Sequence, residues 1–157
     1  MTNTAQRSAA TSPAESRASG FTAAERTAMK ERAEELRLSG RGGKKKADDA
    51  RALLAKIAEM PEADRALAER VHAIVASAAP SLSPKTWYGM PAYADRTGKV
   101  VVYFQAASKF GSRYSTLGFN DSAQLDDGSI WPTSYAITSL TRQDVDDMHA
   151  IVQRAAG

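Results

Sequence analysis

The spacing of hydrophobic positions changes once along the chain, a little beyond its midpoint. Before that point apolar residues recur at helical spacing, first in residues 48–60 around Leu53 and Ile57. Residues 61–79 repeat the pattern around Val71 and begin with a proline, which the first turn of a helix tolerates well. The sequence therefore predicts two consecutive amphipathic helices.

Beyond that point, short runs rich in Val, Tyr, Phe, Trp and Thr alternate with turn residues, which is typical of strands joined by hairpins. These runs are residues 85–88, 92–95, 99–105, 113–119 and 134–138. A last helix is predicted over residues 141–155, with Thr141 as N-cap and Asp144 three residues on. Helices, then strands with short connections, then a helix indicate an α+β fold, with an antiparallel β-sheet of four to five strands and helices packed on one face.

The N-terminal 47 residues form an extension with a different character. Residues 1–20 hold no continuous apolar run, and we expect a disordered tail there. Residues 21–38 are rich in strong helix formers, and Thr22 with Glu25 fits a capping box. A helix is therefore predicted in this part of the extension.

That helix has only a narrow apolar stripe, formed mainly by Met29 and Leu36, so we expect it to dock loosely or not at all. The Gly- and Lys-rich residues 39–47 are expected to form a flexible hinge. The predicted organisation is a tail, a basic helical extension over residues 21–47, and a single α+β domain over residues 48–157.

Charge is divided unevenly between these parts. The chain carries 21 Lys and Arg against 18 Asp and Glu, a formal net charge of +3. Residues 1–47 hold ten of the basic and five of the acidic residues, so the predicted domain is slightly acidic. Binding to nucleic acid through the domain is therefore not expected, and any such affinity should reside in the extension.

Several function classes leave no signature in the sequence. There is no cysteine, which removes disulfides and thiolate metal sites and suits a reducing compartment. No run approaches the roughly 20 apolar residues that span a bilayer, and no secretory signal is evident. The Gly-Gly-Lys of residues 42–44 lacks the spacing of a phosphate-binding loop, and no nucleophile-elbow motif occurs. We expect a cytoplasmic protein without a membrane span, and nothing in the sequence argues for an enzyme.

The stretch TWYGMPAY, residues 86–93, places three aromatic residues around a Gly-x-Pro step. Gly89 permits backbone angles that other residues avoid, and Pro91 keeps Met90 extended, so a rigid bend between two strands is predicted. Met90, held at this bend, is the residue of the stretch best placed to project into a cleft if one forms. Packing in the core is the competing interpretation, and it is commoner for residues of this kind.

Aromatic and basic residues near this bend would form an apolar cleft with a cationic rim if they shared one concavity. Such a cleft would suit a small anionic or aromatic ligand. The candidate ligand-binding residues are Tyr88, Met90, Tyr93, Lys109, Arg113 and Tyr114.

YGMPAY, the following Gly98-Lys99, the pair Tyr103-Phe104 and Lys109 resemble the signature of the YdhG-like family of small bacterial domains of unknown function. The resemblance covers roughly residues 50–156. It implies a compact α+β domain of antiparallel strands flanked by helices, and it implies little about activity.

Some relatives in that family are described as frataxin-like intracellular iron chaperones, which use exposed carboxylates as oxygen ligands. The residues of this chain that could serve as such ligands are Asp121, Asp126, Asp127, Asp146 and His149. Hard oxygen ligands suit iron, but solvated carboxylates are common on any surface. No cofactor is predicted from the residues themselves, and iron is the alternative that the resemblance suggests.

Three hypotheses for function follow. The first is a non-enzymatic domain that binds a small molecule or a protein partner at the aromatic bend. The second is a frataxin-like iron-binding protein. The third is an adaptor whose basic N-terminal extension touches nucleic acid or an acidic protein.

Overall fold

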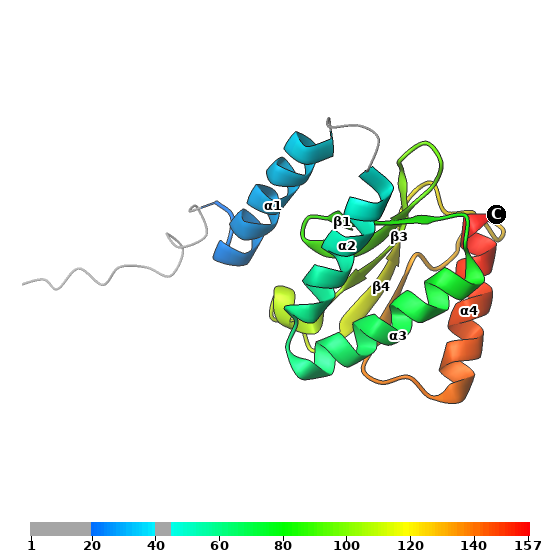
Figure 1. Ribbon diagram of the computed structural model, residues 1–157. Helices are drawn as coiled ribbons and strands as arrows, with labels where there is room; N and C mark the ends of the chain where they lie inside the picture. The colour runs from blue at the N-terminus through cyan, green and yellow to red at the C-terminus, as the bar shows by residue number, and fades with distance from the viewer. Residues whose placement is uncertain (1–19, 40–44) are drawn as a thin grey trace, which may run out of the picture.

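The computed structural model describes residues 20–39 and 45–157 (Figure 1). These residues form four α-helices, a short 3-10 helix and five strands. In chain order the elements are α1 (Ala23–Ser39), α2 (Lys45–Ala58), α3 (Glu62–Ala78), β1 (Ser83–Trp87), β2 (Met90–Ala94), β3 (Val100–Gln105), η2 (Ala107–Lys109), β4 (Ser115–Phe119), β5 (Ser134–Ile137) and α4 (Arg142–Ala156).

The strands form one five-stranded sheet in the order β1-β2-β3-β4-β5, and every neighbouring pair is antiparallel. Because each strand pairs antiparallel with the next in sequence, hairpins and loops connect them without a helical crossover. Helices α2, α3 and α4 lie on one side of the sheet (Figure 1). The α+β fold predicted from the sequence is confirmed.

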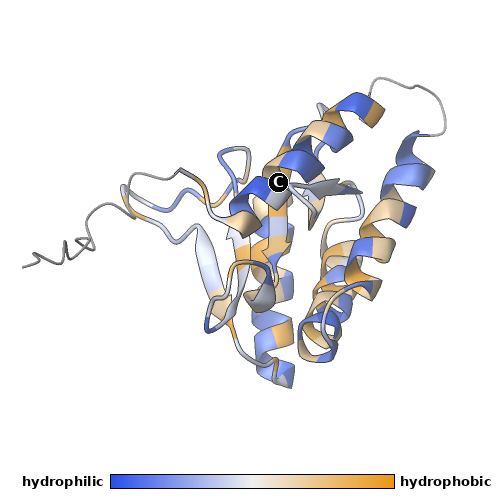
Figure 2. Ribbon diagram, turned by 90° about the vertical axis from the view of Figure 1, so that its left-hand side faces the viewer, coloured by the Kyte–Doolittle hydropathy of each residue, from blue (hydrophilic) through white to orange (hydrophobic). Residues whose placement is uncertain are grey.

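The hydrophobic core lies between these helices and the sheet. Side chains at alternating strand positions face the helices, and α2, α3 and α4 each contribute an apolar stripe to meet them. In Figure 2 each helix carries both hydrophobic and hydrophilic residues along its length, as this arrangement requires. The largest side chains that are fully buried in this core are Leu53, Val71, Val75, Tyr93, Val102, Phe104, Leu117, Leu125 and Val152.

The opposite face of the sheet has its own aromatic cover. Trp87 and Tyr103 lie on this face with ring centroids 5.2 Å apart. The Tyr103 ring crosses the neighbouring strand above Gly118, where a Cβ would collide with it. A glycine in a strand weakens it unless a neighbouring side chain covers the gap, and Tyr103 covers it here.

The predicted helix caps are present. Thr141 Oγ1 accepts from the Asp144 amide at 3.2 Å, and Asp144 Oδ2 accepts from the Thr141 amide at 2.8 Å. Thr22 and Glu25 make the same reciprocal pair at the start of α1. Both helices therefore begin where the sequence places their capping boxes.

The predicted end of the N-terminal extension needs correction, and part of the extension lies outside the described residues. Helix α2 begins at Lys45, so assigning residues 45–47 to a hinge was wrong; their lysines and alanine are good helix formers and continue the helix. Residues 40–44 and the predicted tail, apart from Gly20, lie outside the described residues. None of the helices in the described ranges combines the length and apolar character of a membrane span.

Candidate functional site

The cleft predicted around TWYGMPAY does not form as expected. Met90 and Tyr93 both belong to β2, and a separation of three residues along a strand puts them on opposite faces of the sheet. Met90 is only 6 % exposed. Met90 therefore does not project into a cleft, because it is packed on the face of the sheet away from α2, α3 and α4.

Tyr93 belongs to the core on the helix side. Its hydroxyl lies 3.0 Å from His72 Nδ1 of α3, and the two rings stack with centroids 5.9 Å apart. Burial raises the pKa of Tyr93 and lowers the pKa of His72, so both groups stay neutral at pH 7. The two polar atoms satisfy each other, and Tyr93, which is buried in the core, is not open to a ligand.

Arg113 and Tyr114 lie elsewhere, in the loop between η2 and β4. The Arg113 guanidinium stacks on the Tyr114 ring at 5.5 Å from its centroid. Both residues line a groove of about 490 Å³ that α3 closes on its other side, where Arg70 and Asp64 contribute to the lining. This groove is separate from the aromatic bend.

Tyr88 and Lys109 belong to one site, because both contact α1, the first through Glu35 and the second through Glu31. Tyr88 and Gly89 form the two-residue turn between β1 and β2, with φ of 52° and 73°. Consecutive positive φ values are characteristic of the type I′ turn that matches the twist of a hairpin. Gly89 adopts such angles without cost, as expected, whereas a bulky residue such as Tyr88 does so only under strain.

The turn presents two backbone donors to one carboxylate. The Tyr88 amide donates to Glu35 Oε2 at 3.1 Å, and the Gly89 amide donates to Glu35 Oε1 at 2.9 Å. Each oxygen of the carboxylate thus receives one N–H group. Successive amides in left-handed conformation form a concave anion-binding nest, and Glu35 of α1 occupies it.

A second carboxylate from α1 is held beside the first. Glu31 Oε1 accepts from Lys56 Nζ of α2 at 2.7 Å, and Glu31 Oε2 accepts from Lys109 Nζ of η2 at 2.9 Å. The two lysines are far apart in sequence, and the carboxylate lies between them. All three side chains are largely shielded from water, with exposed fractions of 18–31 %.

The attraction between Glu31 and Lys56 shifts the pKa values of both groups. Burial opposes the ionisation of Glu31, but the hydrogen bonds from Lys56 and Lys109 outweigh it and hold the pKa of Glu31 below its ordinary value. Burial likewise opposes the charge on Lys56, yet the contact with Glu31 raises the pKa of Lys56. Both groups are therefore charged at neutral pH.

Gly89 has a second role besides its backbone angles. The Glu31 carboxylate lies directly over its α-carbon, so that a Cβ would overlap the carboxylate. Glycine at this position lets the acid approach the turn closely. A pocket of about 180 Å³ remains beside the contact, between Glu31, Lys56, Gly89 and Lys109.

Arg32 completes the contact of α1 with the turn. Its guanidinium lies 5.7 Å from the centroid of the Tyr88 ring and 3.3 Å from Glu35 Oε2. The Tyr88 ring in turn packs edge-on against Trp87 at 5.0 Å. These contacts hold the strained Tyr88 in place.

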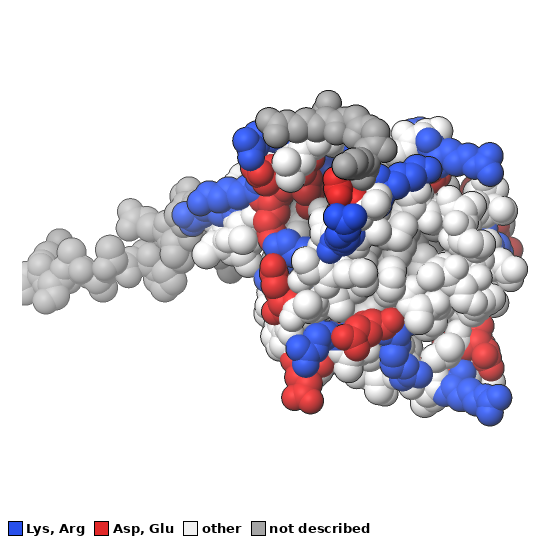
Figure 3. Space-filling model, viewed as in Figure 1, with Lys and Arg blue, Asp and Glu red and all other residues white. Residues whose placement is uncertain are grey.

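We call the donor side of this contact the carboxylate-binding turn, defined as Lys56, Tyr88, Gly89 and Lys109. It supplies two backbone N–H groups and two ammonium groups, drawn from three separate parts of the chain. In Figure 3 acidic and basic side chains adjoin one another on the left, over α1 and α2. These donors hold the two carboxylates of α1, Glu31 and Glu35.

Sequence reasoning missed this site because it considered only the narrow apolar stripe of α1 and expected loose docking or none. The stripe does not dock, since Met29 is 37 % and Leu36 is 56 % exposed, but polar contacts attach the helix on another face. The docked face instead carries Ala28, Glu31 and Glu35, whose spacing of three and four residues places them together on the helix. A pair of glutamates four residues apart was the available signal, but such pairs are common on solvated helices.

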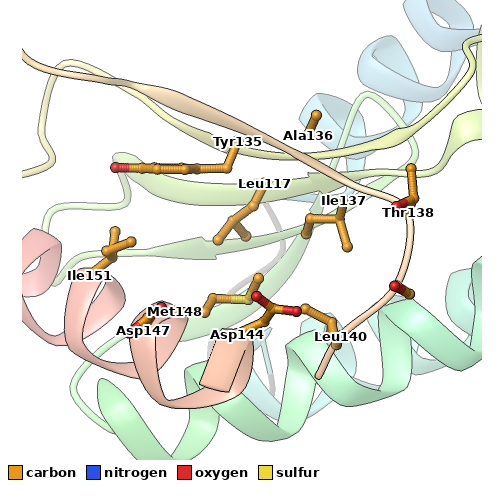
Figure 4. Close-up of a pocket in the computed structure, with 11 residues that line it drawn as sticks. Leu117, Tyr135, Ala136, Ile137, Thr138, Leu140, Asp144, Asp147, Met148 and Ile151 are labelled. Carbon is orange, nitrogen blue, oxygen red and sulfur yellow. The ribbon is translucent and has the colours of Figure 1, made fainter. Parts of the chain in front are cut away.

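Another groove, of about 450 Å³, lies between β5 and α4 (Figure 4). Apolar side chains from both elements point into it, and Asp144 and Asp147 stand at its α4 side. The Thr141 backbone N–H, together with the Thr141 side chain, holds the pKa of Asp144 below its ordinary value, which ties that carboxylate to the helix cap. The lining does not single out one class of ligand.

The residues suggested as iron ligands do not gather into one site. Across the described ranges, no three side chains among His, Cys, Asp and Glu are placed to hold a metal ion together. His149 Nε2 lies 3.3 Å from Ser77 Oγ of α3. The suggested ligands are distributed over two elements, with Asp121, Asp126 and Asp127 in the β4–β5 loop and Asp146 and His149 on α4.

Comparison with protein-family models, curated proteins and solved structures finds no match to this chain. The geometry of the described residues is therefore the basis for a functional proposal.

Proposed function

We propose that this domain is a binding module that recognises carboxylate groups of a partner at the carboxylate-binding turn. The observation that carries the proposal is the pair of adjacent amides at Tyr88 and Gly89, both donating to a single carboxylate. Lys56 and Lys109 add a second pair of donors beside it, for another carboxylate. The site thus offers matched donors for two carboxylates.

The chemistry of the donors favours binding of anions. Hydrogen bonds to an ionised acceptor are roughly twice as strong as neutral ones, and they are strengthened further where water is partly excluded. Backbone amides fix the position of the acceptor, while the lysines supply charge over a wider range of positions. Together these groups select a carboxylate over a neutral polar ligand.

The proposal refines the expectation of a small anionic ligand or partner at the aromatic bend. It also gives a role to YGMPAY, the segment that carries the resemblance to YdhG-like domains. Its tyrosine and glycine supply the anion-binding amides, and the glycine leaves room for the acid.

The test uses the full chain with its own acids neutralised, Glu31→Gln with Glu35→Gln, so that the turn is vacated. Glutarate, a small dicarboxylate, is titrated at pH 7 while the NMR signals of the Tyr88 and Gly89 amides are followed. We expect saturable shifts of both amides, because a free carboxylate takes the place of Glu35. Glutaramide, which has the same shape without charge, should leave the signals in place.

Adding Lys56→Met and Lys109→Met to this variant should abolish the response to glutarate. Lys99→Met is the matched control, since Lys99 is exposed in the turn at the other end of β2. Equal shifts with glutaramide, or no saturable response to glutarate, would contradict the proposal.

A further inference from the structure

We propose that the partner read by the carboxylate-binding turn is an acidic helix carrying Glu-Arg-x-x-Glu, and that α1 is a copy of this ligand held within the chain. The inference rests on the proposed function, because it names the kind of partner that supplies the carboxylates. Its evidence is the way in which α1 occupies the turn.

A helix is needed to satisfy all the donors at once. Glu31 and Glu35 are four residues apart, so they lie on one face of α1, one turn from each other. Glu31 takes the two lysines and Glu35 takes the two amides. The fixed spacing of a helix delivers both carboxylates to their separate donors without further ordering of the backbone.

Arg32, the residue that follows the first of the two acids, adds specificity. Arg32 stacks over the Tyr88 ring and also pairs with Glu35. A ligand with arginine at this position therefore contacts the aromatic side chain as well as the amides of the same turn. This combination distinguishes Glu-Arg-x-x-Glu from a helix that is merely acidic.

Helix α1 is docked in a way that permits exchange. Of its side chains only Ala28 is buried, at 4 % exposure, and none belongs to the hydrophobic core that α2, α3, α4 and the sheet enclose. Its glutamates, Glu31 and Glu35, attach it to the domain through hydrogen bonds and ion pairs. An element that adds nothing to the core can leave without opening it, and a helix with the same acidic face can then take its place.

Contacts within the segment also stabilise the helix after it leaves the turn. The Thr22 and Glu25 capping box at its start and the Arg37–Glu34 ion pair both join residues of this one segment. An isolated helix of this length is marginal in water, so such supports favour folding upon binding. The segment thus retains the features of a transferable helical ligand.

Covalent linkage gives α1 an advantage over an external helix. A tethered ligand acts at an effective concentration that a free competitor must exceed. The wild-type chain therefore masks its own site, and an external acidic helix binds measurably only when α1 is weakened or when its concentration is high.

The experiment titrates a fluorescent synthetic peptide of residues 20–39 into the full chain and follows its anisotropy. The wild-type chain is compared with the variant Glu31→Gln with Glu35→Gln, in which the internal copy lacks its acids. We expect the peptide to bind the variant at least tenfold more tightly than the wild type. Glu69→Gln, which removes one exposed charge from α3, serves as the control and should behave as the wild type does.

Two altered peptides define the recognised pattern. A peptide with Glu31→Gln and Glu35→Gln should not bind the variant chain. A peptide that exchanges neighbours, Glu35→Leu with Leu36→Glu, keeps composition and charge but breaks the four-residue spacing, and it should lose most of the affinity. Equal binding of the exchanged peptide would overturn the helical pattern.

The outcome separates this inference from the proposed function. If glutarate shifts the Tyr88 and Gly89 amides but the wild-type peptide binds no more tightly than glutarate, the turn binds carboxylates and the acidic helix is not its partner. If neither ligand binds the variant, both ideas fail. Tight and equal binding to wild type and variant would show that α1 does not mask the site.

Discussion

The carboxylate of Glu31 lies directly over the α-carbon of Gly89, at the point where any other residue would place its Cβ. Glu31 lies in α1 and Gly89 in the turn between β1 and β2, so the two residues are far apart in sequence. Their approach depends on a glycine that is also required for its positive φ of 73°. One residue thus serves both the hairpin turn and the docking of α1.

Gly89→Ala is expected to destabilise the domain and to release α1. The left-handed backbone costs a non-glycine residue about 1–2 kcal/mol, and the added Cβ expels the Glu31 carboxylate. Chemical denaturation measures the first effect, and loss of amide-exchange protection in α1 measures the second.

Gly98→Ala is the matched control for this substitution. Gly98 has φ of 85°, but nothing lies within 4 Å of the position that its Cβ would take. It should lose a similar amount of stability while α1 stays protected. Unchanged protection of α1 in Gly89→Ala would contradict the close approach of Glu31.

The attachment of α1 is expected to weaken in acid. Because the pKa of Glu31 is lowered in the folded chain, its contribution is present above the ordinary glutamate value of about 4.3 and is lost as the pH falls through the folded pKa. The pKa of Lys56 is raised, so its contribution persists at neutral pH and fades only above about 10.4. Docking is therefore strongest between these limits.

The Tyr88 and Gly89 amide signals, followed from pH 7 to pH 2, measure this effect. We expect both signals to move as Glu31 loses its charge, and high salt should weaken docking at pH 7 as well. Glu31→Gln should remove part of the acid transition. Identical titration curves for the wild type and Glu31→Gln would show that Glu31 does not control docking.

Local patterns accounted for most of the fold. The helical spacing around Leu53 and Val71, the β-branched and aromatic runs, and the capping box at Thr141 all depend on neighbours in sequence, and the structure contains each of them. Each of the five strands overlaps a predicted run. These features were predictable because short-range preferences and the global fold agree.

The docking of α1 could not be predicted in this way. It depends on contacts such as Lys109 with Glu31, which are 78 residues apart in sequence and leave no trace in hydrophobic spacing. The positive φ of Tyr88 was likewise hidden, since a tyrosine gives no signal for it. The separation of Met90 from Tyr93, by contrast, followed from strand alternation and could have been anticipated.

Met90→Ala is expected to cost about 2–5 kcal/mol, the range for truncating a buried methionine. The reason is its burial at 6 % exposure on the face of the sheet away from the helices. Met29→Ala on α1, where the side chain is 37 % exposed, is the control and should change stability by less than about 0.5 kcal/mol. Urea denaturation of both variants checks the difference, and a near-neutral Met90→Ala would point back to an open cleft.

Removal of residues 1–44 is expected to leave a domain that melts cooperatively. The cut falls just before α2, which begins at Lys45, so no helix that contributes to the core is shortened. The loss is confined to the contacts of α1, which are the buried Ala28 and the polar pairs, and each partly exposed ion pair is worth only roughly 0.2–1 kcal/mol. The melting temperature should therefore drop by a few degrees while the transition stays single and steep.

The shortened chain should also respond to glutarate at its Tyr88 and Gly89 amides without further substitution, because α1 no longer fills the turn. A broad, non-cooperative transition would instead show that α1 is required to complete the fold, and the exchange of α1 for an external helix would then be ruled out.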